Sequence, residues 1–295
     1  MSVRKYFVRA VLVLSLFGTL SSPAAAPNAK SQTPFPAFRI VGNLYYVGSL
    51  DLGSYLIATP KGLILINTGF AENTPLIEKS AESLGFHMKD IKILLVGHAH
   101  SDHAAGAADI IKMSGAKYYV MDKDVDAVES GGKPDLSYGD EPNQEFTPLQ
   151  VENVLHDGAN VAFGGMVLTA HLTPGLTKGN TTWTFDEVED RRVLHVVILG
   201  NPGATHAMIL VNNPKYPDIV PYYEKGFALM RTLPCDIFLG DHASYGDLPG
   251  KYKKLQAGDK DAFIDPAGYK AFIDQMQKAF EAQVAKQKAG SGGGL

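Results

Sequence analysis

Cysteine is almost absent from this sequence, and Cys235 is the only one. A single cysteine excludes an intrachain disulfide and a metal site built on several thiolates. The residues around it are mostly apolar, so we expect Cys235 to be a small buried hydrophobic side chain and not a reactive thiol. A metal site in this chain must therefore draw on histidine and carboxylate.

The chain also carries little excess charge. Its net charge is -4, with 45% hydrophobic and 20% charged residues, as in ordinary globular proteins. This balance gives no electrostatic reason to expect nucleic acid or an anionic membrane as a partner. We therefore predict that the chain does not bind nucleic acid.

The amino terminus lacks an apolar run long enough for a comfortable membrane span. The run from Ala10 to Leu20 is shorter than the roughly 20 residues that a span needs. Basic residues precede it and Ala24-Ala25-Ala26 follows it, which is typical of a secretory signal peptide. We predict a signal peptide over residues 1–26. After its cleavage, the mature protein would be periplasmic or secreted and not bound to a membrane. An uncleaved anchor is the alternative.

One short segment, His98-Ala99-His100-Ser101-Asp102-His103, is unusually rich in potential metal ligands. Neutral imidazole and carboxylate are the usual ligands of a divalent metal such as zinc. An apolar run ending at Gly97 precedes the segment and indicates a strand, and a helix is expected from Ala104 to Ser114. α/β proteins place ligand sites on such strand-to-helix loops. Merely solvated histidines would explain this spacing poorly.

The remaining pattern predicts strands in two runs, with helices between and after them. Two sheets packed face to face with helices outside would satisfy it, so the fold class is α/β or α+β. We expect one domain over residues 35–288 and a disordered Gly- and Ser-rich tail over 289–295. The predicted strands are 39–41, 44–47, 54–58, 63–66, 91–96, 117–121, 151–155, 166–172, 181–185, 193–199 and 237–239, and the other predicted helices are 74–84, 216–233 and 266–288.

The pattern His-x-His-x-Asp-His resembles the signature of the metallo-β-lactamase superfamily of zinc hydrolases. Residues 63–69 resemble the strand and turn ahead of that family's site, and residues 173–183 resemble its Pro-Gly-His-Thr-x-Gly loop. Residues 239–243 resemble the segment that carries its last histidine. The likeness covers nearly the whole mature chain and is greatest to the third subclass. It implies a four-layer αβ/βα sandwich.

The resemblance also implies two sets of zinc ligands. The first zinc would take His98, His100 and the residue at position 176, and the second would take Asp102, His103 and His242. Position 176 departs from the family because it holds leucine, which has no lone pair to offer a cation. We therefore expect one zinc, held by the second set, and a weak or empty first position.

Other residues near these motifs have secondary roles in this interpretation. His171 or His206 could stand in for the missing ligand, although both are more simply surface histidines. Asn67 is expected to orient the ligand loop from outside it. Asn201 is neither the bridging Asp nor the zinc-binding Cys of other branches, which fits the third subclass. Tyr138 lies in a long loop and is a candidate for substrate contact.

The resemblance, with its incomplete first zinc position, implies a zinc-dependent hydrolase of modified or reduced activity that opens the β-lactam ring of a small-molecule antibiotic with metal-activated water. Asp102, His98 and His100 are the predicted catalytic residues, with either histidine as a general base if the first position is empty. Two alternatives remain open. One is a zinc hydrolase of another ester, lactone or amide. The other is a degenerate homologue that binds metal without turnover, which Leu176 favours.

Overall fold

The computed structural model describes residues 29–133, 144–206 and 208–291. Several predictions concern other parts of the chain. The signal peptide at 1–26, Tyr138 and the last residues of the predicted tail, 292–295, all lie outside the described residues.

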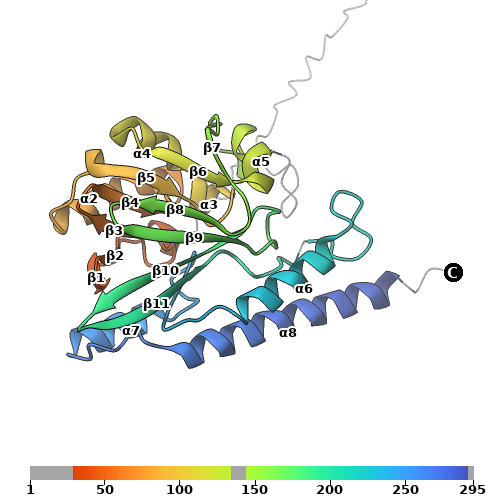
Figure 1. Cartoon of the computed structure of the whole chain (residues 1–295). Coiled ribbons are helices and arrows are strands. Elements are labelled where there is room, and N and C mark those ends of the chain that lie inside the picture. The colour runs from red at the N-terminus through yellow and green to blue at the C-terminus, as the bar shows by residue number, and fades with distance from the viewer. Residues whose placement is uncertain (1–28, 134–143, 207, 292–295) are drawn as a thin grey trace, which may run out of the picture.

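Two β-sheets form the centre of the molecule (Figure 1). The first has seven strands in sequence order, and the second has five in the order β12-β11-β10-β9-β8. The first sheet comprises β1 (Phe38–Val41), β2 (Leu44–Tyr46), β3 (Tyr55–Thr59), β4 (Gly62–Ile66), β5 (Ile91–Leu95), β6 (Lys117–Met121) and β7 (Asn153–Leu155). The second comprises β8 (Ala159–Phe163), β9 (Met166–Leu172), β10 (Thr181–Glu189), β11 (Arg192–Leu199) and β12 (Ile237–Gly240).

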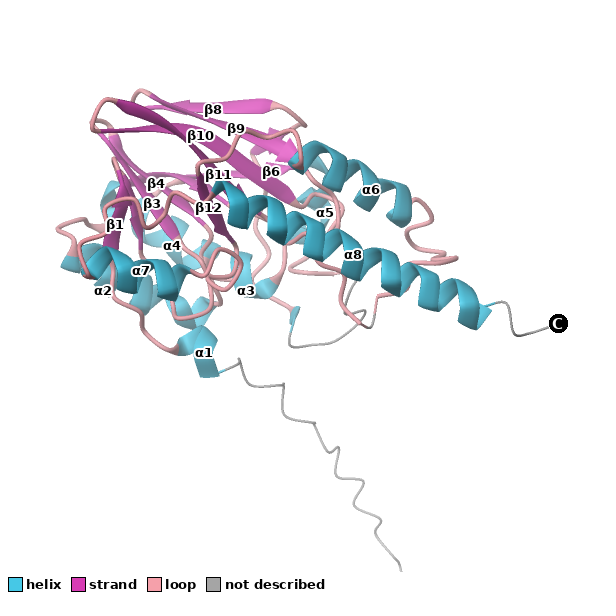
Figure 2. Cartoon of the chain, turned by 90° about the horizontal axis from the view of Figure 1, so that it is seen from below, coloured by secondary structure: helices cyan, strands magenta, loops and turns pink. Residues whose placement is uncertain are grey.

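Helices cover the outer faces of both sheets (Figure 2). Side chains of α2 and α4 pack on the first sheet, and those of α6 and α8 pack on the second. The resulting order of layers is the predicted αβ/βα sandwich. The helices are α1 (Ala29–Gln32), α2 (Thr74–Ser83), α3 (Ser101–Ala104), α4 (Ala107–Ser114), α5 (Val125–Glu129), α6 (Ile219–Met230), α7 (Leu248–Gln256) and α8 (Pro266–Ser291), with 3-10 turns at Ala71–Asn73, Met88–Asp90 and Asp122–Asp124.

Three apolar cores hold these layers together. The central core lies between the sheets and contains the buried rings of Tyr46, Tyr55 and Trp183. Two further cores lie between each sheet and its helices. Strands β4 and β5 are buried on both faces, which explains why their sequences are apolar almost throughout and not alternating. Burying each large aliphatic side chain stabilises the fold by about 1.5–3 kcal/mol.

The helix predicted from residue 104 is wrong in detail, because the structure has two helices there. The chain bends at Gly106, whose N–H donates to Gly69 O at 3.2 Å. A Cβ at Gly106 would lie 2.9 Å from Thr68 O, so this close approach requires glycine. The sequence pattern also missed α5, α7 and β8, and the last helix extends to Ser291, beyond its predicted end.

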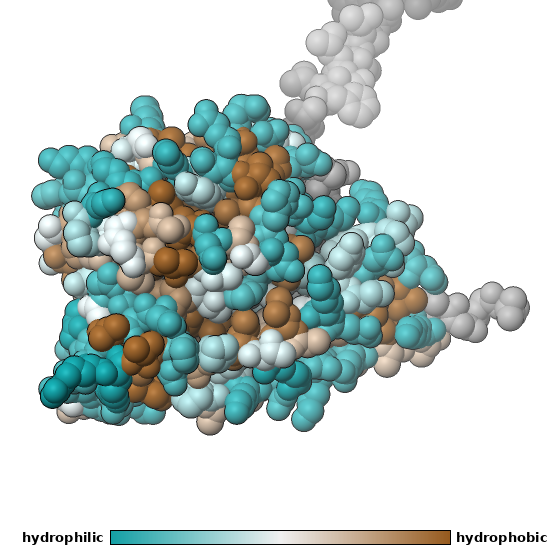
Figure 3. All heavy atoms as spheres, in the orientation of Figure 1, coloured by the Kyte–Doolittle hydropathy of each residue, from teal (hydrophilic) through white to brown (hydrophobic). Residues whose placement is uncertain are grey.

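The surface in Figure 3 is a mixture of polar and apolar side chains, with an apolar patch at the lower left near the β10–β11 hairpin and α7. Val188 and Val193 face each other across that hairpin and are both exposed. Among the described residues, no helix is both long and apolar enough to cross a bilayer.

Glu187 makes stability depend on pH. Its side chain points inward from β10, and Oε2 accepts a hydrogen bond from Asn43 N at 3.3 Å. Burial raises the pKa of this carboxyl to about 7. The folded state therefore holds a proton that the unfolded chain releases, and stability falls as pH rises from about 4.5 to 7. The free energy of unfolding should therefore be lower at pH 8 than at pH 5. We expect this difference to be about 1–2 kcal/mol smaller in Glu187→Gln than in the unmodified protein.

Urea unfolding of the metal-free protein at both pH values measures this difference. Glu189→Gln is the matched control on the same strand, because Arg39 donates to Glu189 and lowers the pKa of that carboxyl. The control should therefore not reduce the loss of stability toward pH 8. A Glu187→Gln variant with the same pH dependence as the unmodified protein would contradict the prediction.

Candidate metal centre

The centre lies where the carboxyl ends of strands from both sheets meet. Strands β4 and β5 run parallel, as do β11 and β12, so the segments after them emerge at one edge of the sandwich. Two backbone hydrogen bonds join the two sheets at this edge: Thr181 N, at the start of β10, donates to Gly97 O, and Gly53 N, ahead of β3, donates to Asp241 O, each at 2.7 Å. Trp183 Nε1 also donates to Val96 O at 3.0 Å, which fixes the second sheet to the end of β5.

Asp102 and His103 lie on the short helix α3, and not on a loop as predicted. His100 is the N-cap of this helix, and His103 N donates to His100 O at 3.1 Å. One helical turn therefore turns the chain back on itself and brings residues 100, 102 and 103 to the same place as His98.

The structure brings all five predicted ligand residues together. Three groups have one potential ligand atom per residue within 4.8 Å of the others. The groups are His98, His100 and Asp102; Asp102, His103 and His242; and His98, His103 and Asp241. Asp102 belongs to the first two groups, so its carboxylate lies between the two predicted metal positions.

The buried side of the centre is built around His98. Its Nδ1 lies 2.9 Å from Asp241 Oδ2, while Nε2 is buried and has no hydrogen-bond partner among the described residues. Burial lowers the pKa of this imidazole to about 4, so the ring is neutral at pH 7. A buried imidazole nitrogen with a lone pair and no hydrogen-bond partner is suited to a cation, so the donor set fits a divalent metal such as zinc.

The open side of the centre consists of Asp102 and His242, whose side chains are 26% and 20% exposed. Asp102 Oδ2 lies 3.2 Å from His103 Nε2 and 3.7 Å from His242 Nε2. Burial opposes ionisation of Asp102, but the surrounding imidazoles outweigh it and lower its pKa. Asp51 Oδ1 lies 3.4 Å from the other ring nitrogen of His242 and so orients this ring from behind.

Leu176 is only 3% exposed and belongs to the core between the second sheet and α6 and α8. Its loop is nevertheless held against the ligand segment by the buried carboxylate of Asp124. This carboxylate accepts hydrogen bonds from Thr177 Oγ1 (2.7 Å), Gly179 N (2.7 Å) and Ala99 N (3.0 Å). The loop is therefore fixed beside His98 and His100 although position 176 offers no ligand atom.

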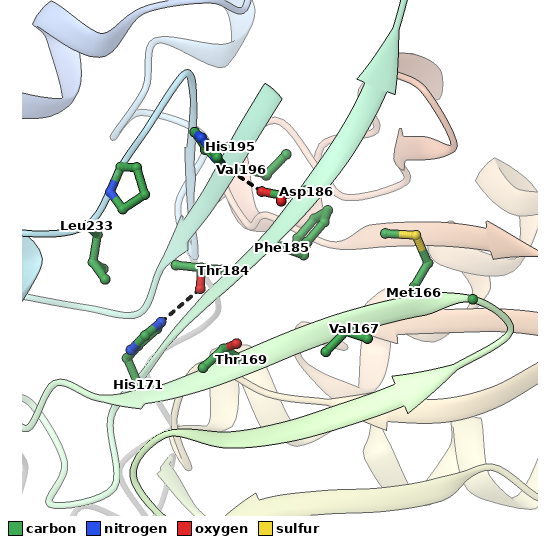
Figure 4. A pocket seen from close by; sticks show the side chains of 12 residues that line it. Met166, Val167, Thr169, His171, Thr184, Phe185, Asp186, His195, Val196 and Leu233 are labelled. Atoms are coloured by element: carbon green, nitrogen blue, oxygen red, sulfur yellow. Dashed lines mark hydrogen bonds and ion pairs between the residues drawn. The ribbon is translucent and has the colours of Figure 1, made fainter. Parts of the chain in front are cut away.

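The two histidines considered as substitutes lie elsewhere. His171 Nε2 lies 2.8 Å from Thr184 Oγ1, in a groove of about 490 Å³ on the second sheet that His195 and Asp186 also line (Figure 4). His206 is exposed and lines a cavity against α8. Neither joins a ligand group among the described residues. Cys235 is partly buried, and burial raises the pKa of its thiol to about 12.

Asn67, which the sequence placed outside the ligand loop, holds the residue just before the ligand segment, since its Oδ1 accepts from Gly97 N at 2.8 Å. Sequence reasoning gave no role to Asp241, Asp51 or Asp124, which orient the ligands or hold the loops around them. The position of Asp241, between an apolar strand and His242, was a usable signal. Asp51 and Asp124 had none, because their partners are distant in the sequence.

Comparison with known proteins explains this arrangement. Residues 54–196 match the family model of the Metallo-beta-lactamase superfamily. The FEZ-1 metallo-beta-lactamase from Legionella gormanii is 48% identical, with a TM-score of 0.85 over 87% of this chain and 98% of that chain. The chain belongs to the metallo-beta-lactamase superfamily.

Two other similar metallo-beta-lactamases are of subclass B3, the third subclass that the sequence predicted. The class B3 di-zinc enzyme LRA-12 from an Alaskan soil metagenome is 33% identical, with a TM-score of 0.82 over 87% of this chain and 97% of that chain. BJP-1 of Bradyrhizobium japonicum is 31% identical, with a TM-score of 0.83 over 89% of this chain and 98% of that chain.

A curated metal-dependent hydrolase from Cupriavidus necator is 28% identical over 113 residues, which span 38% of this chain and only 39% of that protein. Membership of the metallo-beta-lactamase superfamily, together with the ligand groups at the strand ends, identifies the chain as a metal-dependent hydrolase.

Proposed function

We propose that this protein is a zinc-dependent β-lactamase of the third subclass that works with one zinc, held by Asp102, His103 and His242. The observation that carries the proposal is this complete set of three ligands, of which Asp102 and His242 lie on the open side of the centre. Catalytic zinc sites hold three protein ligands and leave one position for water or substrate. The 48% identity to FEZ-1 over nearly all of that chain supports the choice of substrate class.

The first metal position is weaker because its donor set depends on Asp102. His98 and His100 supply two imidazoles, and the third potential ligand of their group is the same Asp102 carboxylate that the second group requires. Leu176 supplies none. In this proposal, His98 and His100 act as general bases and do not hold a second zinc.

When bound, zinc supplies Lewis acidity that makes water a stronger nucleophile at neutral pH and polarises a carbonyl group. The water oxygen adds to the lactam carbonyl carbon, the C–N bond breaks, and the ring nitrogen takes a proton. Asp102 orients the reacting water, and the Nε2 atom of His98 or His100 accepts its proton. Asp51 and Asp241 hold the rings of His242 and His98 in place during these steps.

The test is the initial rate of carbapenem hydrolysis by the zinc-loaded protein, beside a sample treated with EDTA and a treated sample that is given zinc again. We expect hydrolysis that chelation lowers by about 100-fold or more and that zinc restores. Zinc-dependent hydrolysis of a lactone or ester, without carbapenem turnover, would replace this proposal with another zinc hydrolase. Bound zinc with no turnover of any of these substrates would establish a degenerate homologue.

We propose that the mature protein is exported from the cytoplasm. It is supported by the basic, apolar and small-residue order of residues 1–26. A periplasmic or secreted location would place the enzyme where β-lactams enter the cell envelope.

A further inference from the structure

A chain of buried hydrogen bonds connects three strand ends behind the metal centre. Asn67 follows β4, Gly97 follows β5 and Asp241 follows β12. Asn67 Oδ1 accepts from Gly97 N at 2.8 Å, and Asn67 Nδ2 donates to Asp241 Oδ1 at 2.7 Å. The second oxygen of Asp241 lies 2.9 Å from His98 Nδ1. The side chains of Asn67 and Asp241 are completely buried, so solvent does not compete for these bonds.

The direction of every bond in this chain follows from its first member. A backbone N–H can only donate, so the atom of Asn67 that faces Gly97 must be its oxygen. The Asn67 amide then presents its NH₂ group to Asp241. An ionised carboxylate can only accept, so His98 must carry its proton on Nδ1. Its lone pair is thereby assigned to Nε2, the buried atom that has no hydrogen-bond partner among the described residues.

Asp241 is better placed to hold a ligand than to be one. It forms a possible ligand group with His98 and His103. However, its two oxygens already accept from Asn67 and from His98. Gly97 also packs against this carboxylate, since a Cβ at Gly97 would lie 2.3 Å from Asp241 Oδ2. Direct binding of a metal by Asp241 would disrupt these contacts.

We propose that Asp241 is the positioning residue of the metal centre: it fixes the tautomer and direction of the His98 ring, and Asn67 holds it in the orientation that this requires. The inference rests on the proposed metal centre but not on the identity of the substrate. The effect concerns the weaker first metal position, to which His98 belongs, and not the zinc held by Asp102, His103 and His242. Carboxylates that hold a metal-binding histidine in this way commonly contribute 10- to 100-fold to metal affinity.

The hydrogen-bond directions predict different positions of the His98 proton in single and double variants. In Asp241→Asn, the new amide oxygen accepts from Asn67 and the new NH₂ group faces His98 Nδ1. His98 must then move its proton to Nε2, which removes the lone pair from the metal side. In Asn67→Asp, two buried carboxylates would face each other where the present bond is 2.7 Å, so this variant should be destabilised.

The double variant Asn67→Asp/Asp241→Asn should restore the pattern. The new carboxylate at position 67 would accept from Gly97 N and from the new amide at position 241, whose oxygen would again accept from His98 Nδ1. This exchange reverses one bond, between positions 67 and 241, and returns the His98 proton to Nδ1. The weak contact from Asn67 Nδ2 to Gly53 O, at 3.3 Å, is the one bond lost.

The experiment records ¹⁵N spectra of the histidine rings in the metal-free protein and then titrates each variant with Co²⁺. We expect the Nδ1–H tautomer of His98 in the unmodified protein and in the double variant, and the Nε2–H tautomer in Asp241→Asn. At excess Co²⁺, the affinity of the weaker first position, which includes His98, should fall by about 10- to 100-fold in Asp241→Asn and recover to within about tenfold in the double variant. The Co²⁺ held by Asp102, His103 and His242 should bind as before in each variant. These readouts need no substrate, so a failure to hydrolyse carbapenems would leave them unaffected.

Asp124→Asn is the matched control, because Asp124 is also a buried carboxylate but accepts from Ala99 N, Gly179 N and Thr177 Oγ1. It should lower stability in urea while leaving the His98 tautomer unchanged. If Asp241→Asn does not fold, the His98 tautomer of the double variant still tests the proposal. An unchanged tautomer and an unchanged Co²⁺ affinity of the first position in Asp241→Asn, or a folded double variant with the Nε2–H tautomer, would overturn the proposal.

Discussion

Replacing Asp102 with asparagine should remove both the tightly bound zinc and the hydrolytic activity. Its carboxylate is one of the three ligands of the proposed zinc, and it also belongs to the potential ligand group of His98 and His100. An amide oxygen is a far weaker zinc ligand than a carboxylate. Metal catalysis contributes several kcal/mol to the rate, and each 1.36 kcal/mol is tenfold, so we expect kcat/KM for a carbapenem to fall by about 10³-fold or more.

Zinc content after dialysis and the initial rate of hydrolysis measure the two effects. Asp109→Asn is the matched control, because Asp109 is exposed on the neighbouring helix α4 and belongs to no ligand group among the described residues. It should retain zinc and activity. An Asp102→Asn variant that keeps one zinc through dialysis would show that His103 and His242 hold the metal with other ligands.

Replacing Leu176 with histidine should create a second metal position. The loop that carries Leu176 is already fixed to the ligand segment through Asp124 and through the bond from Thr181 N to Gly97 O. An imidazole at position 176 would complete a set with His98 and His100 without using Asp102. We expect Co²⁺ stoichiometry to rise from about one to about two per chain, with a second set of visible absorption bands.

The same substitution should lower the stability of the metal-free protein, because Leu176 is buried in an apolar core. Burying an imidazole without a partner costs about 1–3 kcal/mol, and the added metal should offset this cost. Leu176→Asn is the control, since it is polar and of similar size but offers a poor ligand. It should lose stability without gaining a metal. One Co²⁺ per chain in a folded Leu176→His variant would mean that position 176 does not face His98 and His100.

Much of the fold was predictable because its strongest signals are local. The apolar runs of β4 and β5 and the glycine after α4 reflect burial and a left-handed helix end, which neighbouring residues determine. The elements that sequence reasoning missed are those without such signals. Helix α5 has only five residues, and β8 (Ala-Asn-Val-Ala-Phe) has one buried side chain and an alanine at an exposed position, so its alternation is weak in the sequence.

The break between α3 and α4 shows the limit of local reasoning. The sequence predicts one helix over 104–114, yet Gly106 N bonds to Gly69 O instead of continuing one helix. The partner follows a different strand, β4, so no window of local sequence contains it. This break sets the direction of α3 and hence of Asp102 and His103.

The sequence by itself determined which chemistry this protein can offer: imidazoles and carboxylates at His98, His100, Asp102, His103 and His242, and none at Leu176. Ligand chemistry resides in side-chain identity, which the sequence states directly. Only the tertiary structure decided how these groups are held. The carboxylates of Asp241, Asp51 and Asp124 act on residues that distant strands and loops deliver, and a hydrogen bond requires proximity in space and not in sequence.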